Sequence, residues 1–323
     1  MREIEQLVEI SRYYGSDSRY VVAGGGNTSY KDGKRLWVKA SGHSLATITE
    51  EGFAVMDRAK LDLISTRRYS DDVPEREEEV KRDLADACIT KDRRPSVETS
   101  LHNIIKTPFV VHLHPAVVNA LMCSRRAEQV TAELFDNSAL YVPYADPGYT
   151  LFKAVERGME EHRSLHGADP EVIFLQNHGI FVGGESVAEI KERYRQVLDT
   201  LESRLTEPLP GEGRGVCECA KDIIPALRMV LSSDGKLKSL KVENSGLIEK
   251  FSGSEDDFLA VVRPFTPDHI VYCKSDYLYL GSADPEDAKM AVERFALEHG
   301  YLPKVIMIKG LGLVSVGDNT AAS

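Results

Sequence analysis

Short apolar runs alternate with longer amphipathic segments along the chain, and this alternation limits the possible folds more than any other feature. Phe109 to Leu113 and Val172 to Gln176 are apolar runs, whereas Ile4 to Tyr14 and Arg76 to Lys91 carry apolar residues at helical spacing. The short runs predict strands and the long segments predict helices. Alternating helices and strands pack in layers, so we expect an α/β fold. The same reasoning predicts strands at Tyr20 to Ala23, Leu36 to Lys39 and Ile180 to Val182, and helices from Ser96 to Ile105, Ala116 to Met122, Tyr149 to Leu165 and Ser186 to Arg204.

One segment, EPLPGEGRG at Glu207 to Gly215, is typical of a linker because it contains two prolines and three glycines. The 323 residues are enough for two domains that each bury a core. We therefore expect a first domain at residues 1–206, a linker at 207–217 and a smaller α/β module at 218–323.

Part of the second module resembles part of the first. The segment EVIFLQNHGIFVGG aligns with KVIMIKGLGLVSVG, and FVVHLH aligns with HIVYCK. Two interpretations stay open: a partial duplication whose second copy lost its histidines, and chance similarity between apolar segments. The alignments place Leu311 at the position of His178, Tyr272 at that of His112 and Lys274 at that of His114.

The chain stops where the first copy would begin its long helix at Ser186. We therefore expect the native protein to continue with a helix or a further domain.

Composition and charge exclude several classes of protein. The formal net charge of −11 disfavours nucleic-acid binding, which needs clustered basic residues. No run of 18 apolar residues occurs, and the charged start at Met1 to Glu5 lacks a signal-peptide core. Five scattered cysteines disfavour a disulfide framework, and Cys217-x-Cys219 is interpreted as incidental. We expect a cytoplasmic protein without a membrane span.

Three histidines follow apolar strands. His112 and His114 are two residues apart on a predicted strand, so both side chains lie on one face. His178 occupies the corner Asn177-His178-Gly179 after another strand, where glycine permits a tight turn. Alone, His178 is more often a structural turn residue. Together, three imidazoles and an open position predict a catalytic zinc site, because a structural zinc needs a fourth protein ligand.

Several polar turns are candidates for holding an anion. The loop Gly24 to Ser29 lacks the lysine of a Walker A loop, yet its glycine amides, with Asn27 and Thr28, can form an anion-binding concavity. A plain glycine-rich hairpin is the other interpretation. Further candidates are Lys39, Ser41 and Gly42 in a second turn, and Ser96 at a helix start, which also suits simple helix capping. Glu98 follows in the first turn, and His102 is interpreted as structural or as supporting the site from behind.

The ordered motifs GGGNTSYKDGKRLWVKASG, RPSVETSLH, VVHLHP and FLQNHGIFVGG resemble the class II aldolase/adducin family over Ile4 to Arg204. The later segment resembles the aldolase part of bifunctional rhamnulose-phosphate aldolase/dehydrogenase proteins. The resemblance implies an α/β/α sandwich around a mixed, largely antiparallel sheet, often in a tetramer. By motif it implies His112, His114 and His178 as zinc ligands, Glu98 as the catalytic acid/base, and Asn27, Ser41, Gly42 and Ser96 as phosphate contacts.

The chain departs from the family pattern at Val97, where fuculose-type enzymes have a serine, so one side-chain donor to phosphate is lost. Tyr144 and Tyr149 are candidates for the tyrosine that such aldolases take from a neighbouring subunit.

The expected function is a Zn²⁺-dependent aldolase that cleaves a ketose 1-phosphate to dihydroxyacetone phosphate and an aldehyde, with another divalent first-row metal as an option. The expected partners are a sugar phosphate and further copies of the chain in a homo-oligomer. Alternatives on the same scaffold are a sugar-phosphate epimerase, a dehydratase and a sugar-acid decarboxylase. A non-catalytic, adducin-like scaffold ranks below these because all three histidines are present.

Overall fold

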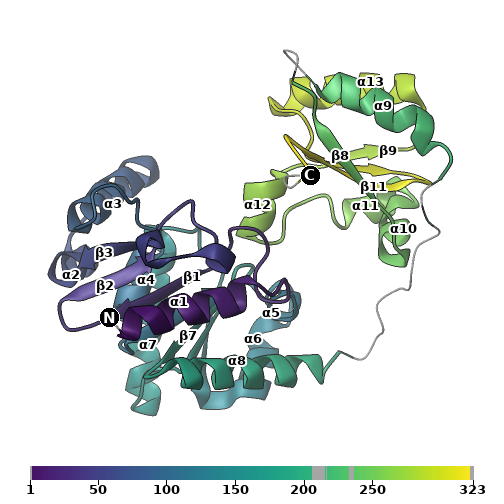
Figure 1. Cartoon of the computed structure of the whole chain (residues 1–323). Coiled ribbons are helices and arrows are strands. Elements are labelled where there is room, and N and C mark those ends of the chain that lie inside the picture. Colours follow the sequence, from purple (N-terminus) through teal and green to yellow (C-terminus); the bar gives the residue numbers. More distant parts are fainter. Residues whose placement is uncertain (1, 206–214, 216, 233–235, 321–323) are drawn as a thin grey trace. The chain divides into compact units, whose positions relative to one another are not determined.

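The computed structural model describes residues 2–205, 215, 217–232 and 236–320. The chain divides into two compact units, residues 1–205 and 206–323 (Figure 1). Most of the predicted linker lies outside the described residues, so the predicted domain limits stay predictions. Within the described ranges, every helix is too short or too polar to cross a membrane.

The first unit is built on a seven-stranded sheet with the strand order β3-β2-β1-β4-β7-β6-β5. Only β5 and β6 pair in parallel among these neighbours. The sheet is therefore mixed and largely antiparallel. The strands are β1 (Asn27–Lys31), β2 (Arg35–Lys39), β3 (Phe53–Asp57), β4 (Phe109–Leu113), β5 (Ala139–Val142), β6 (Val172–Leu175) and β7 (Gly179–Gly184).

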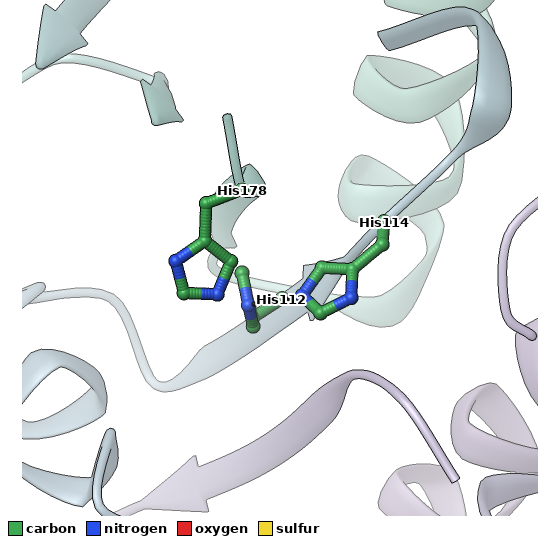
Figure 2. A group of neighbouring side chains, drawn as sticks. All are labelled: His112, His114 and His178. Atoms are coloured by element: carbon green, nitrogen blue, oxygen red, sulfur yellow. Dashed lines mark hydrogen bonds between the residues drawn. The ribbon is translucent and has the colours of Figure 1, made fainter. Parts of the chain in front are cut away.

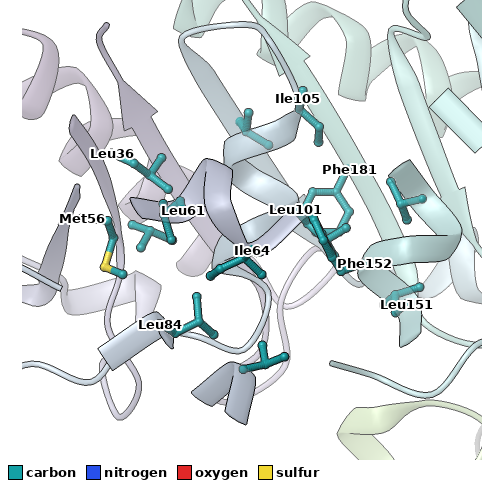
Figure 3. Packing of buried hydrophobic residues seen from close by; sticks show 14 of the residues in the cluster. Leu36, Met56, Leu61, Ile64, Leu84, Leu101, Ile105, Leu151, Phe152 and Phe181 are labelled. Atoms are coloured by element: carbon teal, nitrogen blue, oxygen red, sulfur yellow. The ribbon is translucent and has the colours of Figure 1, made fainter. Parts of the chain in front are cut away.

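Helices cover both faces of this sheet (Figure 1). Successive residues of a strand point to opposite faces, and Val110 and Val111 of β4 accordingly belong to two different cores. Figure 3 shows the core beneath α2, α3, α4 and α7; α1, α5, α6 and α8 cover the other. The α/β/α sandwich is thus confirmed. The helices are α1 (Arg2–Gly15), α2 (Arg58–Thr66), α3 (Val73–Ala87), α4 (Thr99–Ile104), α5 (Ala116–Met122), α6 (Ala127–Phe135), α7 (Tyr149–His166) and α8 (Val187–Glu202).

Two local predictions are wrong. Tyr20 to Ala23 is a turn, because the Asp17 carbonyl accepts the amides of Tyr20 and Val21 and Ala23 has a φ of +54°. The predicted helix from Ser96 begins only at Thr99, because the Ser96 hydroxyl and carbonyl already bind the amides of Glu98 and Thr99 in a preceding turn. The strand that follows the glycine loop begins at Asn27, inside the segment interpreted as a loop.

The second unit contains a four-stranded sheet, β8-β11-β10-β9, whose core lies under α9 and α13. The β9–β10 pair is parallel and the others are antiparallel, as in the β4-β7-β6-β5 half of the first sheet. The elements are α9 (Ala220–Leu231), β8 (Ser239–Glu243), α10 (Gly246–Ser252), α11 (Glu255–Leu259), α12 (Pro267–Cys273), β9 (Leu278–Leu280), α13 (Pro285–His299), β10 (Val305–Ile308) and β11 (Gly312–Gly317).

The strand registers of the two halves also agree. Val314 opposes Val242 in the second unit as Phe181 opposes His112 in the first, so β8 is the counterpart of β4. The residue after each strand then matches Asn244 with His114. The alignment of HIVYCK with FVVHLH is therefore wrong, because HIVYCK lies in and just after helix α12 and forms no strand. Val172 pairs with Val182 and Leu175 with Gly179, as Val305 pairs with Ser315 and Ile308 with Gly312.

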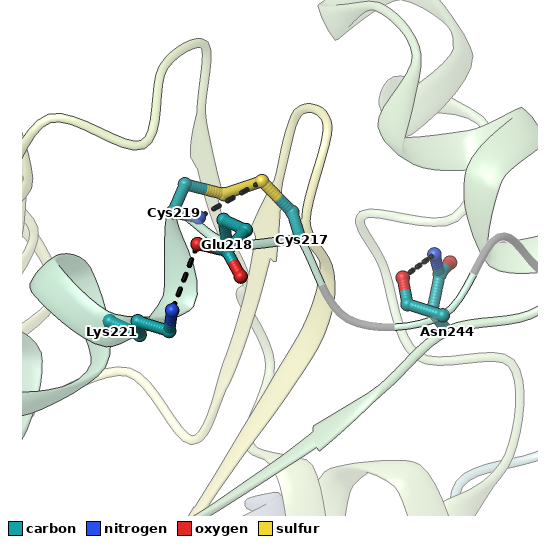
Figure 4. The surroundings of a disulfide bond; sticks show 6 residues. Cys217, Glu218, Cys219, Lys221 and Asn244 are labelled. Carbon is teal, nitrogen blue, oxygen red and sulfur yellow. Dashed lines mark hydrogen bonds and ion pairs between the residues drawn. A yellow bond between two sulfur atoms is a disulfide. The ribbon is translucent and has the colours of Figure 1, made fainter.

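Cys217 and Cys219 form a disulfide at the start of α9, with their Cα atoms 5.2 Å apart (Figure 4). The interpretation of this pair as incidental to metal binding stays a prediction. A separation of two residues in a turn brings the two sulfur atoms together without any long-range constraint, so the pair is no framework across the fold. Cys88, Cys123 and Cys273 are free thiols.

Candidate metal centre and active site

Three imidazoles meet at the ends of two neighbouring strands. His112 is in β4, His114 directly follows it, and His178 occupies the corner between β6 and β7. Asn177 adopts a left-handed φ of +56°, which turns the chain back and aims His178 at the end of β4. One nitrogen from each ring lies within 4.8 Å of the others (Figure 2). The structure thus brings the three predicted ligands together.

The tautomer of His112 follows from its partner. Its Nδ1 lies 3.0 Å from the carbonyl oxygen of Ile180, which can only accept, so Nδ1 carries the proton and Nε2 keeps a lone pair. Burial lowers the pKa of His112 to about 4. The ring of Phe181 stacks on it with centroids 4.0 Å apart. His112 is therefore a neutral, oriented ring whose free nitrogen faces His114, 2.9 Å away.

Glu98 lies against the same nitrogens. Its Oε1 is 3.3 Å from Nε2 of His112 and 3.1 Å from Nε2 of His178, and Asn27 donates a hydrogen bond to Oε2. Burial works to raise the pKa of Glu98, but the imidazoles of His112 and His178 outweigh it and hold the pKa well below its usual value. Glu98 is therefore a buried carboxylate beside the three rings.

A divalent cation fits this group of atoms. The lone pair of His112 and the carboxylate of Glu98 converge, because Nε2 of His112 and Oε1 of Glu98 lie 3.3 Å apart and both side chains are buried. Buried acceptors that face one another are costly unless a positive charge lies between them. Three imidazole ligands suit zinc and other first-row divalent metals. His112, His114 and His178 could therefore hold the metal, with Glu98 beside it.

Gly179 makes the close approach of these ligands possible. A Cβ atom at this position would lie 2.5 Å from Cδ2 of His114 and 2.5 Å from the carbonyl oxygen of Leu113. We expect Gly179→Ala to displace His114 and weaken metal binding about tenfold or more, as judged by competition with a fluorescent chelator. Gly33→Ala is the matched control, because a Cβ there meets nothing within 4 Å. Equal metal affinity in the two variants would contradict the expectation.

Two predicted phosphate loops lie next to Glu98. Ala40 pairs with Pro95 in an isolated bridge, and the amide of Ser41 donates to the carbonyl of Arg94 at 2.9 Å. Gly42 has a φ of +88°, which favours glycine in this turn. The hydroxyl of Ser96 accepts from the amide of Glu98. The structure thus brings Ser41 and Gly42 next to the segment Arg94 to Ser96, which directly precedes Glu98 in the sequence.

The structure places Thr28 away from this group, whereas Lys39 contacts the glycine loop. Thr28 faces the opposite side of the sheet, where its hydroxyl lies 2.7 Å from that of Ser11 on α1. Lys39 is buried and donates to the carbonyl of Gly24 at 3.0 Å. The Lys39 ammonium therefore binds the backbone of the glycine loop. Val97, the departure from the family pattern, is 62% exposed.

A buried polar network lies behind the metal ligands, and only its histidine, His102, is identified from the sequence, whereas Ser29 and Lys31 are not. Nδ1 of His102 lies 2.7 Å from the hydroxyl of Ser29, and Lys31 donates to the His102 carbonyl at 2.8 Å. His102 also packs edge-on against Phe181, the ring that stacks on His112. His102 therefore supports the site from behind. The sequence contains a signal for this network. Side chains alternate between the two faces of β1, so the polar residues Asn27, Ser29 and Lys31 lie on one face.

Lys31 should give stability a measurable pH dependence. Burial lowers its pKa to about 7, while an unfolded lysine titrates near 10.4. Between these values the unfolded state binds more protons, so Lys31 makes the free energy of unfolding rise with pH by up to about 1.4 kcal/mol per pH unit. We expect urea denaturation to show this rise in the wild type and its loss in Lys31→Met. Lys34→Met, at an exposed lysine of the next turn, is the control and should keep the rise.

The two tyrosine candidates make their contacts elsewhere. Tyr149 packs its ring against Tyr69 with centroids 5.0 Å apart. Tyr144 is exposed and donates to Asp146 at 3.0 Å. Neither of these contacts involves a metal-site residue, so a role for either tyrosine from a neighbouring subunit stays a prediction.

Comparison with known proteins identifies relatives of the first unit. The family described as Class II Aldolase and Adducin N-terminal domain matches residues 5–204. An L-fuculose phosphate aldolase of Methanocaldococcus jannaschii is 24% identical over 193 residues, which cover 57% of this chain and 86% of that protein. The N-terminal class II aldolase domain of a conserved protein from Thermoplasma acidophilum has 27% sequence identity and a TM-score of 0.52, covering 62% of this chain and 92% of that one.

One relative extends over both units. An uncharacterized oxidoreductase of Bacillus subtilis, YuxG, is 27% identical over 367 residues. The match covers 99% of this chain but 52% of that protein. The chain therefore spans about half the length of this curated relative.

Proposed function

Because this chain belongs to the class II aldolase and adducin N-terminal domain family, we propose that it is a metal-dependent aldolase. In this proposal it cleaves a ketose 1-phosphate to dihydroxyacetone phosphate and an aldehyde. The observation that carries the proposal is the buried carboxylate of Glu98 within 3.3 Å of two imidazoles of a three-histidine cluster. The M. jannaschii relative, named as a fuculose phosphate aldolase, supports the same reaction.

His112, His114 and His178 would hold the metal, and we propose Zn²⁺ as its identity. When bound, the metal supplies Lewis acidity that draws electron density from the substrate carbonyl. The residues around it fix the ligands: Ile180 orients His112 through Nδ1, and Phe181 packs on the same ring. These contacts hold Nε2 of His112 within 3.3 Å of Oε1 of Glu98.

Glu98 moves the proton. In the condensing direction its carboxylate takes a proton from carbon 3 of dihydroxyacetone phosphate. In cleavage the C4 hydroxyl loses its proton to a base from the neighbouring subunit as the C3–C4 bond breaks and the aldehyde forms, and the carboxylic acid of Glu98 then protonates carbon 3 of the other fragment. Asn27 fixes the carboxylate through Oε2, which leaves Oε1 for the proton. The buried position excludes water that would compete for this transfer.

We propose that phosphate binds where the glycine loop, Ser41, Gly42 and Ser96 adjoin Glu98. Asn27 and the loop amides would complete this site, with Lys39 supporting the loop rather than contacting the phosphate. We also propose a cytoplasmic homo-oligomer that brings a tyrosine from a neighbouring subunit to the substrate.

The test is an incubation of the purified full chain with zinc and each of three substrates: L-fuculose 1-phosphate, L-rhamnulose 1-phosphate and L-ribulose 5-phosphate. Dihydroxyacetone phosphate is detected by coupled reduction with glycerol-3-phosphate dehydrogenase. We expect it from a ketose 1-phosphate, with loss of activity on chelation and recovery on adding zinc. Conversion of the pentulose phosphate to its epimer without carbon–carbon cleavage would replace the aldolase proposal with an epimerase.

A further inference from the structure

A pocket of about 670 Å³ lies in the second unit beside the loop from Lys309 to Gly312. By the strand registers, this loop is the counterpart of Gln176 to Gly179, the corner that carries His178. Asn244, the counterpart of His114, also lines the pocket. The second unit therefore has an open pocket at the edge of the sheet where the first unit has its metal centre.

Smaller residues explain why the pocket is open here. In the first unit the amide of Asn177 donates to the carbonyl of Met122, a fully buried residue at the end of α5. Helix α10 follows β8 as α5 follows β4, and its last residue is Ser252. Gly310 replaces Asn177 with the same left-handed backbone, at φ +79° against +56°. In the second unit, serine and glycine thus stand at the positions that methionine and asparagine occupy in the first.

The pocket does not repeat the metal chemistry. Val242 and Leu311 stand where His112 and His178 stand in the first unit, and Leu311 is fully buried in the apolar core. Among the described lining residues there is no imidazole. A ligand of another kind must therefore be considered.

The charges and polar atoms of the walls define that ligand. Lys250 and Lys309 are exposed at the pocket, and neither forms an ion pair with a carboxylate among the described residues. The one carboxylate of the wall, Glu249, accepts a hydrogen bond from Nδ2 of Asn244 at 3.2 Å. Oδ1 of Asn244 is buried and has no hydrogen-bond partner in the described structure.

We propose that this pocket binds a small anion that also carries a hydroxyl group, such as a sugar phosphate or a sugar acid. Lys250 and Lys309 neutralise the anionic group, and the ligand hydroxyl donates to Oδ1 of Asn244. Phosphate and carboxylate ligands share this chemistry. The site is separate from the metal centre and does not depend on the aldolase reaction.

The experiment uses the full chain and hydrogen–deuterium exchange, which reports each region separately. The probes are glycerol 3-phosphate, D-glycerate and uncharged glycerol. We expect one of the two anions to slow exchange saturably in peptides containing residues 244–253 and 309–312, while glycerol has no effect. Protection by glycerol 3-phosphate would identify a phosphate site, and protection by glycerate a carboxylate site. Protection by neither anion would overturn the proposal.

Variants then assign the contacts. We expect Lys250→Ala/Lys309→Ala to weaken the protecting anion about tenfold or more, and Asn244→Leu to weaken it in the same peptides. The matched control Lys241→Ala/Lys289→Ala removes two exposed lysines that do not line the pocket and should bind as the wild type does. Exchange without ligand checks that each variant is folded. Unchanged affinity in the folded Lys250→Ala/Lys309→Ala protein would overturn the proposal.

Discussion

His112→Ala is expected to lose the bound metal and, with it, the cleavage activity of the first unit. The substitution removes one of the three imidazole ligands and leaves only His114 and His178 to bind the metal. Residues that merely orient metal ligands typically change affinity 10- to 100-fold, so we expect loss of a ligand itself to weaken binding by more than about 100-fold. Elemental analysis of the purified variant and the coupled assay for dihydroxyacetone phosphate measure the two effects.

Folding must be checked separately, because His112 is fully buried. The carbonyl of Ile180 loses its imidazole donor, but the hydroxyl of Tyr194 lies 3.4 Å from the same oxygen and limits the cost. His162→Ala is the matched control: this buried histidine binds two backbone carbonyls, of Ala168 and Asn137, away from the metal site. We expect it to lose thermal stability while keeping its metal. A folded His112→Ala protein with normal zinc content and activity would contradict the metal assignment.

The three histidines could be identified from the sequence because local geometry decides their direction. Side chains two residues apart on a strand share a face, and a glycine corner redirects the chain regardless of distant contacts. What the sequence could not show is that β4 and β7 are neighbours in the sheet. That pairing places His178 beside His112, and it depends on long-range contacts between residues some seventy positions apart.

The structure places Thr28 on the face of the sheet opposite the predicted anion site for a related reason. As part of a loop, its hydroxyl was free to turn toward an anion, but β1 begins one residue earlier, at Asn27. Once Asn27 opposes His112, strand alternation forces Thr28 to the α1 side. The face of a strand residue follows from where pairing starts, and a glycine-rich sequence does not fix that starting point.

The misplaced alignment of HIVYCK shows the limit of comparing apolar segments. The segment HIVYCK matches FVVHLH in hydrophobicity. However, Pro267, the first residue of α12, and the polar residues around the segment favour a helix. The true counterpart of β4, Ser239–Glu243, is half polar because no helix such as α1 or α8 covers that face among the described residues of the second unit. The sequence of β8 does not resemble that of β4 where β8 is exposed. Of these two features, only the strand register identifies β8 as the counterpart of β4.

Glu98→Gln should separate proton transfer from metal binding. The amide has nearly the shape of the carboxylate and can still accept the hydrogen bond from Asn27, but it cannot take up a proton near neutral pH. We expect cleavage to fall by about 10²- to 10⁴-fold, the usual contribution of a general acid or base, while the zinc content stays close to that of the wild type. The second readout is exchange of the carbon 3 proton of dihydroxyacetone phosphate with deuterium, followed by NMR, which should disappear with the cleavage activity.

The control is Glu51→Gln, at an exposed carboxylate that accepts a hydrogen bond from the hydroxyl of Thr49. It makes the same chemical change away from the site and should leave both readouts at the wild-type level. If Glu98→Gln lost its zinc together with its activity, Glu98 would be a metal ligand and the base would lie elsewhere. If it still exchanged the carbon 3 proton at the wild-type rate, another group must carry the proton, because Oε1 of Glu98 is the only carboxylate oxygen that the described residues place within 3.3 Å of two of these imidazoles.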